Sequence, residues 1–329
     1  MRRELPVNYP PITSLMTHAS ILSIITTNEN YIPWFIFNFI QMSVEDTGLD
    51  FYHFYNTDFL CPYLEVIPLN RDFYKEFINI DIINLIVKCI RNNYYVIPII
   101  DEYYISNSDS FKKNHQPHPI LIYGYDYMNN LFSAGDFFKY GKYTFSKISF
   151  HELKEAYLKY DSDYWLKGIK IIKKIDYKHT FRLNDFIDLL YRYLEGYEPS
   201  TNYNHLLSNY RDKFGLNHVY DKLYSEMECF HNFKSFDFRT LPIFCDHKKV
   251  LIIAIEYLIS IGYTKLKYLL PAFRQLFDQA VILRNKFIKS ILKEENDQFD
   301  YRDLNNLKNS EIKLLYETIS ILEMSKSMN

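Results

Sequence analysis

His118 and Asp136 have the residue types and the spacing that a catalytic pair requires. The sequence between them predicts two adjacent strands, residues 120–125 and 131–134, joined by a turn whose Asn and Asp residues tolerate turn geometry. His118 then begins one strand and Asp136 follows the end of the other, 18 positions later (136 − 118), so antiparallel pairing brings the two side chains together. A histidine held by an aspartate is the base of a nucleophilic catalyst, whereas strand capping in a buried hairpin is the structural alternative.

The residues that lead into this hairpin form a further predicted strand, 94–105, which carries two acidic side chains near its end. Pro98 within it favours an edge position or an irregularity at a strand end, because proline cannot donate a ladder hydrogen bond. Asp101 and Glu102 follow. They either orient His118 or face solvent, and we expect solvent, since unpaired carboxylates are rarely buried.

A metal site is a second interpretation of the same region. His115, His118 and Asp136 offer two imidazoles and one carboxylate, which suit zinc or iron. His115 and His118 are three positions apart on an extended segment and therefore face opposite sides, so joint ligation needs a bend at Pro117. We favour the catalytic interpretation and predict neither a metal nor a cofactor.

The elements around the hairpin predict an α+β domain with a mainly antiparallel sheet. Helical periodicity is present over residues 14–25, 32–42, 81–93 and 150–160, and further strands are expected over 141–149 and 165–175. Ser14 or its neighbour Thr13 is placed to cap the first of these helices.

The character of the chain changes beyond about Lys178, where one amphipathic segment follows another. Helices are predicted over residues 183–196, 216–230, 246–262, 265–295 and 309–324. We therefore expect two domains, an α+β domain over residues 1–178 and an all-helical domain over residues 179–329.

Composition excludes several classes of function. With 48 % hydrophobic residues, 24 % charged residues and a formal net charge of −2 over 329 residues, the chain has no excess of positive charge for binding nucleic acid. The most apolar window, residues 31–40, is too short to span a membrane, and the N-terminus has no apolar run typical of a signal peptide. No C-x-x-C spacing occurs, so we expect a reduced, cytoplasmic protein; its cysteines are Cys61, Cys89, Cys229 and Cys245.

Several blocks resemble a known family. YYVIPIIDEYY, HPILIYGYD, DFFKYGKYTF and SFHELKEAY resemble the N-terminal domain family of the butirosin biosynthesis protein H, whose fold is papain-like and shared with C39-type cysteine peptidases. FGLNHVYDKL and FDFRTLPIFCDHKKVLIIAIEYL resemble the helical tail of relatives associated with nonribosomal-peptide gene clusters. The resemblance covers most of the chain and implies a papain-like domain followed by a helical one.

The resemblance also implies acyl transfer in natural-product biosynthesis. The relative for which the family is named moves an acyl group from a carrier-protein thioester to an amine through a cysteine nucleophile. His118 matches the catalytic histidine of that family, and Asp136 matches its orienting residue. The nucleophile is expected at the start of the first helix, where residues 14–18 contain no cysteine and only Ser14 and Thr17 carry hydroxyls. Helix capping is the structural alternative for both.

Two hypotheses follow. The first is an acyltransferase or amidase-type enzyme that acts on acyl or peptidyl groups held on the phosphopantetheine arm of a carrier protein, with a degenerate nucleophile. The second is a catalytically inactive relative that binds a carrier protein or a partner enzyme. The missing cysteine favours the second hypothesis, and the presence of both His118 and Asp136 favours the first. The sequence predicts no nucleic-acid or membrane partner and does not determine an oligomeric state.

Overall fold

The computed structural model describes residues 1–45, 48–51, 61–78, 80–160, 168–196, 213–228, 239–293 and 301–326. It shows a mixed α/β protein in which the paired strands are antiparallel. The chain divides into two compact units: the first comprises Met1–Glu29 and Tyr55–Tyr177, and the second comprises Asn30–Phe54 and Lys178–Asn329. Residues 30–54, which we expected in the N-terminal domain, therefore belong to the second unit.

The first unit is built on an eight-stranded sheet. Its central order is β4-β10-β5-β7-β8-β9, with β1 paired to β7 and β6 paired to β5. The strands are β1 (Arg2–Glu4), β4 (Leu64–Leu69), β5 (Tyr94–Asp101), β6 (Pro117–Pro119), β7 (Leu121–Asp126), β8 (Leu131–Lys139), β9 (Lys142–Ser149) and β10 (Ile169–Lys174).

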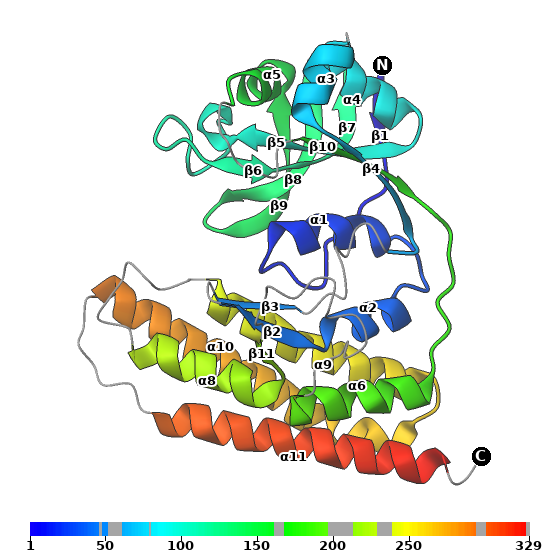
Figure 1. Ribbon diagram of the computed structural model, residues 1–329, viewed down its shortest axis with the longest axis vertical. Helices are drawn as coiled ribbons and strands as arrows, with labels where there is room; N and C mark the ends of the chain where they lie inside the picture. The colour runs from blue at the N-terminus through cyan, green and yellow to red at the C-terminus, as the bar shows by residue number, and fades with distance from the viewer. Residues whose placement is uncertain are drawn as a thin grey trace. The chain divides into compact units, whose positions relative to one another are not determined.

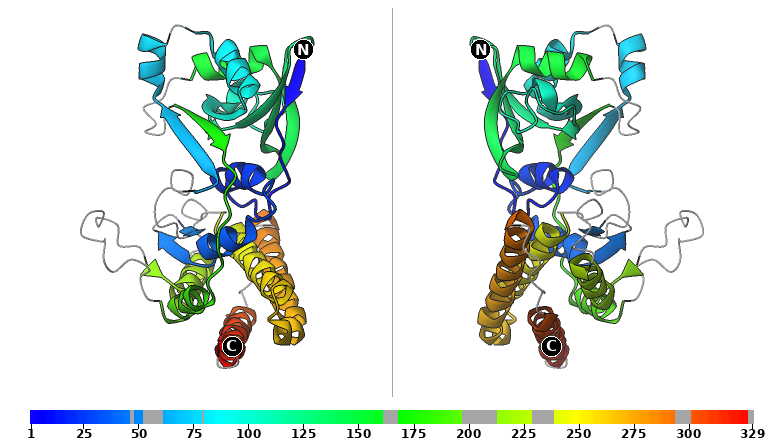
Figure 2. Two further views of the ribbon diagram at one scale, coloured as in Figure 1. Left: turned by 90° about the vertical axis from the view of Figure 1, so that its right-hand side faces the viewer. Right: turned by 90° about the vertical axis from the view of Figure 1, so that its left-hand side faces the viewer.

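Helices cover both faces of this sheet. α4 and α5 lie on one face, and α1 lies on the other against β8 (Figures 1 and 2). The core fills the layer between the sheet and α4, where Ile86 and Ile90 are fully buried with Val96. The helical elements of this unit are α1 (Met16–Ile25), α3 (Arg71–Phe77), α4 (Ile82–Arg91), η1 (Glu102–Tyr104) and α5 (Phe150–Leu158).

The predicted hairpin is present, with a longer second strand than expected. β8 runs to Lys139, so Asp136 lies inside the strand, where it pairs with Thr144 of β9. His118 lies on β6, a separate short strand opposite Ile100 of β5. The chain thus pairs with β5 twice, once through β6 and again through β7.

Pro98 does not mark an edge strand, because β5 lies between β10 and β7. The residue instead lies where the partner of β5 changes from β7 to β6: Val96 faces Ile122, and Ile99 faces Pro119. Proline has no N–H to donate, and this missing donor falls at a break in the ladder. Of the two expectations for Pro98, the structure therefore shows an irregularity and not an edge position.

The second unit contains helices and a small antiparallel sheet of order β11-β2-β3. Because β11 lies at Lys213–Phe214, the region after residue 179 is not all helical as expected. The remaining elements are α2 (Ile32–Phe39), β2 (Met42–Glu45), β3 (Gly48–Phe51), α6 (Leu183–Glu195), α8 (Leu216–Glu228), α9 (Thr240–Ser260), η3 (Thr264–Tyr268), α10 (Leu270–Lys293) and α11 (Tyr301–Lys326).

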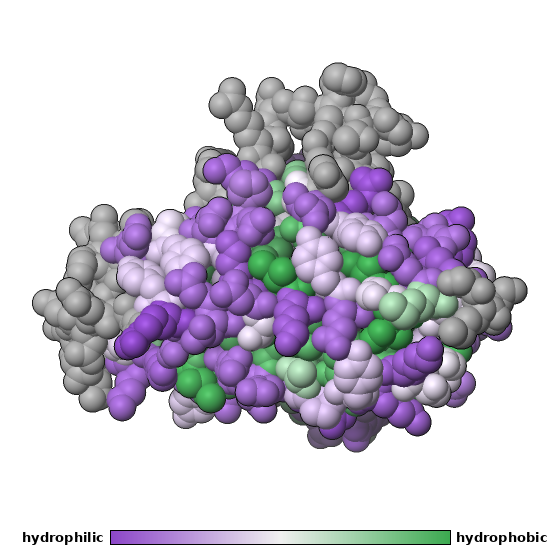
Figure 3. All heavy atoms as spheres, turned by 90° about the horizontal axis from the view of Figure 1, so that it is seen from below, coloured by the Kyte–Doolittle hydropathy of each residue, from purple (hydrophilic) through white to green (hydrophobic). Residues whose placement is uncertain are grey.

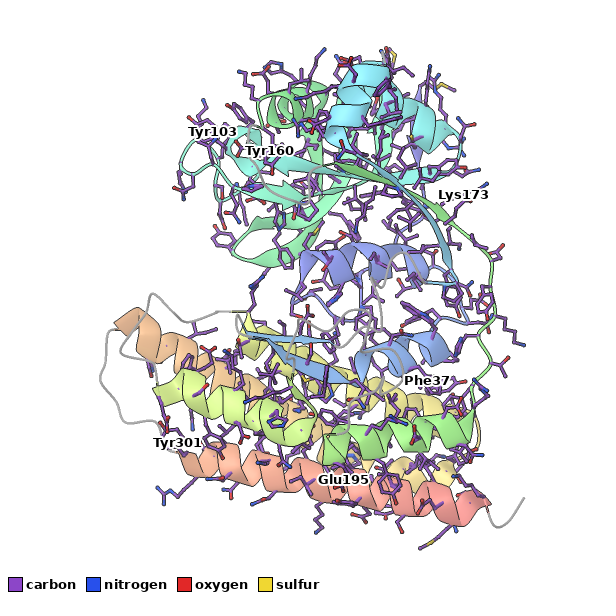
Figure 4. All side chains as sticks on the ribbon, viewed as in Figure 1. Phe37, Tyr103, Tyr160, Lys173, Glu195 and Tyr301 are labelled. Atoms are coloured by element: carbon purple, nitrogen blue, oxygen red, sulfur yellow. The ribbon has the colours of Figure 1, made fainter. Side chains whose placement is uncertain are left out.

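Aromatic packing explains why residues 30–54 belong to this unit. Phe37 of α2, labelled in Figure 4, contacts the rings of Phe181 and Phe186, and Phe39 contacts the ring of Phe51. α2 also packs along α9. Burial of these large side chains outweighs proximity in the sequence.

A buried polar cluster crosses the helices of the second unit. Lys248 of α9 lies 2.6 Å from both carboxylate oxygens of Glu311 on α11, and the side chains of both residues are fully buried. The Tyr193 and Tyr220 hydroxyls donate to the same carboxylate at 3.2 and 2.7 Å. His247 donates from Nε2 to the Ile40 carbonyl at 2.7 Å.

The surface of the second unit that Figure 3 shows is mainly hydrophilic, and its hydrophobic areas are interrupted by polar side chains. None of the helices in the described parts of the chain is both long enough and apolar enough to cross a lipid bilayer.

Candidate active site

The site lies at the end of β5, within the first unit. β5 ends at Asp101, and the short helix η1 begins at Glu102, so the backbone turns there. The Asp101 carboxylate accepts a hydrogen bond from the amide of Tyr103 at 3.0 Å, which caps η1 and fixes the turn. This turn brings the Glu102 carboxylate to His118 on β6.

His118 is held by two carboxylates through the same ring nitrogen. Its Nδ1 lies 3.1 Å from Oδ1 and 3.4 Å from Oδ2 of Asp136, and 3.3 Å from Oε1 of Glu102. The backbone amide of Phe137 donates to Asp136 Oδ1 at 2.7 Å, and the Ser108 hydroxyl donates to Glu102 Oε2 at 3.2 Å. Each carboxylate is thus oriented by a second donor.

Burial and charge make this cluster unusual. The side chains of Asp136 and Glu102 are 3 % and 9 % exposed, whereas that of His118 is 21 % exposed. Neither carboxylate has a Lys or Arg partner among the residues that the structure describes. Two buried acidic groups therefore share one imidazole.

The charges shift two pKa values. Burial lowers the pKa of His118, but Asp136 and Glu102 together outweigh it, so the pKa is raised. Burial is the largest influence on Glu102 and raises its pKa. The charge of His118 acts in the opposite direction, the nearby charge of Asp136 raises the pKa again, and hydrogen bonds from Ser108 and Ser110 lower it by less, so the pKa of Glu102 is raised. Both shifts favour an extra proton in the cluster.

The geometry suits a general base. A carboxylate only accepts hydrogen bonds, so Nδ1 of His118 carries the hydrogen that faces Asp136. Nε2 then holds the lone pair. The described contacts of His118 all involve Nδ1, which leaves Nε2 for a substrate or a nucleophile.

Tyr143 of β9 contacts α1 near this pair. It is buried, and its hydroxyl lies 3.1 Å from the hydroxyl of Ser23 on α1. Burial raises the pKa of Tyr143, the hydrogen bond with Ser23 lowers it, and the charge of nearby Asp136 raises it. A Cβ at Gly135 would lie 2.6 Å from that hydroxyl, so the glycine makes room for the tyrosine beside Asp136.

A second His–carboxylate pair lies next to the first. His115 Nδ1 is 2.6 Å from Asp101 Oδ2, and the His115 ring stacks on Tyr103 at 4.2 Å between ring centroids; Tyr103 is labelled in Figure 4. The His115 side chain is 66 % exposed. His115 and His118 therefore take different partners, and the grouping of both with Asp136 does not form.

The two acidic residues at the end of β5 do not face solvent as expected. Asp101 and Glu102 are 4 % and 7 % exposed. Sequence reasoning noted their position but missed that Glu102 completes the site. The signal was the acidic pair at the end of a predicted strand, in the segment that leads to His118.

The two hydroxyl candidates lie at the start of α1, but neither is in contact with His118. Thr17 is exposed in the first turn of α1, and Ser14 is half-buried just before the helix. Leu15 is the N-cap of α1 and makes no side-chain cap, so neither Thr13 nor Ser14 occupies the cap position that we expected. The described hydrogen-bond and ion-pair partners of His118 are Glu102 and Asp136 only.

No cysteine in the described part of the chain pairs with His118 either. Burial raises the pKa of Cys89 to about 11 and that of Cys245 to about 12, which opposes thiolate formation. Cys61 is buried, and Cys229 lies outside the described residues.

One set of side chains in the described residues has the spacing of metal ligands. Glu102, His118 and Asp136 each offer one ligand atom, and these atoms lie within 4.8 Å of one another. Among the described residues, these three are the only such donor set for a cation, and they include the candidate base, His118.

Comparisons with known proteins give no independent identification. Neither a scan against protein-family models nor a search of curated proteins returned a match.

Proposed function

We propose that this chain is a papain-like acyltransferase or amidase-type enzyme of natural-product biosynthesis. Its substrates would be acyl or peptidyl groups held as thioesters on the phosphopantetheine arm of a carrier protein. His118 is the general base, and Asp136 is its positioning residue. The single observation that carries the proposal is the 3.1 Å contact between Nδ1 of His118 on β6 and Oδ1 of Asp136 on β8.

The base can serve acyl transfer in two ways. In both, Nε2 of His118 accepts a proton from the attacking group as that group forms a bond to the thioester carbonyl carbon. The carbon–sulfur bond then breaks, and the imidazolium returns the proton to the leaving thiolate. The attacking group is either the acceptor amine itself or a hydroxyl of the protein, for which Ser14 and Thr17 are the candidates after a movement of the start of α1.

Intact-mass spectrometry tests the proposal. The full chain is mixed with acylated carrier proteins and an amine acceptor, and the masses of carrier and protein are followed for wild type, His118→Ala and His115→Ala. His115 is the matched control because it is a second imidazole with its own buried carboxylate. We expect acyl loss from the carrier in wild type and His115→Ala but not in His118→Ala. Equal acyl loss in all three would contradict the role of His118.

One observation favours a second candidate function, an inactive relative that binds a carrier protein or a partner enzyme. His118 has neither a thiol nor a hydroxyl among its described partners. In the mass assay, this function predicts a stable complex with a carrier protein and no change in acyl mass in any of the three proteins. Turnover that depends on His118 would exclude it.

A further inference from the structure

The charge of the His118 site is incomplete. Glu102 and Asp136 are both buried, and the one basic group that either contacts among the described residues is His118. Even with a charged imidazole, the three side chains carry a net charge of −1. An uncompensated buried charge is unfavourable, so such a site takes up a further positive charge, either a proton or a metal cation.

The arrangement of the atoms accommodates a metal cation. Both carboxylates approach Nδ1, but Nδ1 carries at most one hydrogen and cannot satisfy both at once. The N–O separations of 3.1 and 3.3 Å match those between neighbouring ligands of one ion. Ligand atoms at about 2.1 Å from a cation lie about 3.0–3.4 Å apart in octahedral or tetrahedral geometry.

The surroundings also match those of a metal site. The Ser108 hydroxyl donates to Oε2 of Glu102, and the Phe137 amide donates to Oδ1 of Asp136, so each carboxylate has an outer partner of the kind found in metalloproteins. One imidazole and two carboxylates suit Zn²⁺, Mn²⁺ or Fe²⁺, and three protein ligands leave further positions open for water. His118 remains 21 % exposed, so an ion has access from solvent.

We propose that Glu102, His118 and Asp136 bind one divalent transition-metal cation, with Zn²⁺ as the representative ion. This inference goes beyond the proposed function and does not rest on it. The ion coordinates Nδ1 of the neutral imidazole tautomer whose hydrogen is on Nε2, and the further proton that balances the unbound site is released to solvent. Cation binding and the base function of His118 therefore exclude each other, and Zn²⁺ is expected to inhibit any reaction that needs the base.

Isothermal titration calorimetry of the full chain, freed of metal by a chelator, tests the proposal with ZnCl₂ alone as the probe. We expect one site per chain with micromolar or tighter affinity. Two buffers of different ionisation enthalpy should show proton release on binding. Glu102→Gln and Asp136→Asn should each weaken that site by at least roughly tenfold, because each removes a ligand charge. His115→Ala should leave it unchanged, since His115 lies outside the donor set.

Two results would overturn the proposal: no saturable Zn²⁺ binding by wild type, or an affinity in Glu102→Gln equal to that of wild type. The first would mean that a proton alone balances the site. Circular dichroism of each variant establishes that it is folded before titration. As a second measurement that needs no variant, Zn²⁺ should raise the melting temperature of wild type, and the rise should continue with the logarithm of the free Zn²⁺ concentration above the dissociation constant. Zn²⁺ binding by a chain whose metal-free form shows no acyl transfer would support this inference and contradict the proposed function. Acyl transfer by a chain that does not bind Zn²⁺ would support the proposed function and contradict this inference.

Discussion

The two units each contain a buried polar cluster, and the clusters differ in completeness. In the second unit, Lys248 and Glu311 balance each other, both side chains are fully buried, and two tyrosine hydroxyls complete the carboxylate. In the first unit, His118 is shared by two carboxylates, and its imidazole reaches solvent. The cluster of the second unit is thus fully buried, and its opposite charges balance. The cluster of the first unit is partly exposed and has an excess of negative charge.

This difference separates structure from chemistry. The Lys248–Glu311 cluster has no access for a ligand, and its contacts join α6, α8, α9 and α11, so it fixes how the helices pack. A buried pair of this kind specifies an arrangement more than it adds stability. The His118 site holds unbalanced charge near solvent, which favours neither packing nor stability and is typical of functional sites.

The largest effect is expected from Glu311→Gln. The change leaves the buried ammonium of Lys248 without its counter-charge, and loss of one partner of a buried pair lowers the free energy of unfolding by about 3–5 kcal/mol. Denaturant titration followed by circular dichroism measures the loss. Lys313→Gln on the exposed side of α11 is the matched control and should change stability little. The double variant Lys248→Met, Glu311→Leu should recover much of the lost stability. A double variant as unstable as Glu311→Gln would contradict the role of the unpaired charge.

The second effect concerns activity. Asp136→Asn keeps the shape of the side chain but removes the charge that orients His118, so acyl transfer should fall by about a hundredfold to a thousandfold. Rates of acyl loss from a carrier thioester measure this. His115→Ala, which removes the imidazole of the other pair and leaves Asp101 in place, is the control and should retain most of the rate. A larger fall in the control than in Asp136→Asn would contradict this role and would point to the His115–Asp101 pair instead.

Glu102→Gln applies the same chemical change as Glu311→Gln to the other cluster. Here it removes an excess negative charge, so the free energy of unfolding should stay within about 1 kcal/mol of wild type or rise. Denaturant titration at neutral pH compares the two variants directly. A loss as large as that of Glu311→Gln would show that the two clusters are alike and that the His118 site is structural.

A third ion pair, at the surface of the first unit, should give the smallest effect. The hydrogen bond from Lys147, with that from Ser133, lowers the pKa of Glu4 to about 2. Because the folded-state pKa lies below the unfolded one, the contribution of Glu4 is present above pH 4.5 and is lost as the pH falls through 2. Its side chain is 34 % exposed, so screening reduces the contribution to about 1 kcal/mol or less.

Thermal unfolding of wild type and Glu4→Gln at pH 7 and pH 2 measures this contribution. The two proteins should differ slightly at pH 7 and converge at pH 2. A difference that grows as the pH falls would contradict the sign of the shift.

The sequence contained much of the local structure but not the long-range packing. The alternation and turn residues between His118 and Asp136 were sufficient to predict that the two side chains meet. The reason is that Leu121, three residues after His118, pairs with Gly135, which precedes Asp136. Glu102 was not assigned, since the direction of its side chain depends on η1, a turn of three residues that no periodicity reveals. The position of residues 30–54 in the second unit depends on aromatic contacts with residues more than 100 positions away, which a local pattern does not contain.

The role of His118 as a base is tested most directly with a small substrate. An acyl-pantetheine thioester is offered with an amine, and release of free thiol is followed for wild type, His118→Ala and His115→Ala. The account predicts release by wild type and His115→Ala and none above background by His118→Ala. Release by His118→Ala at the wild-type rate would contradict it.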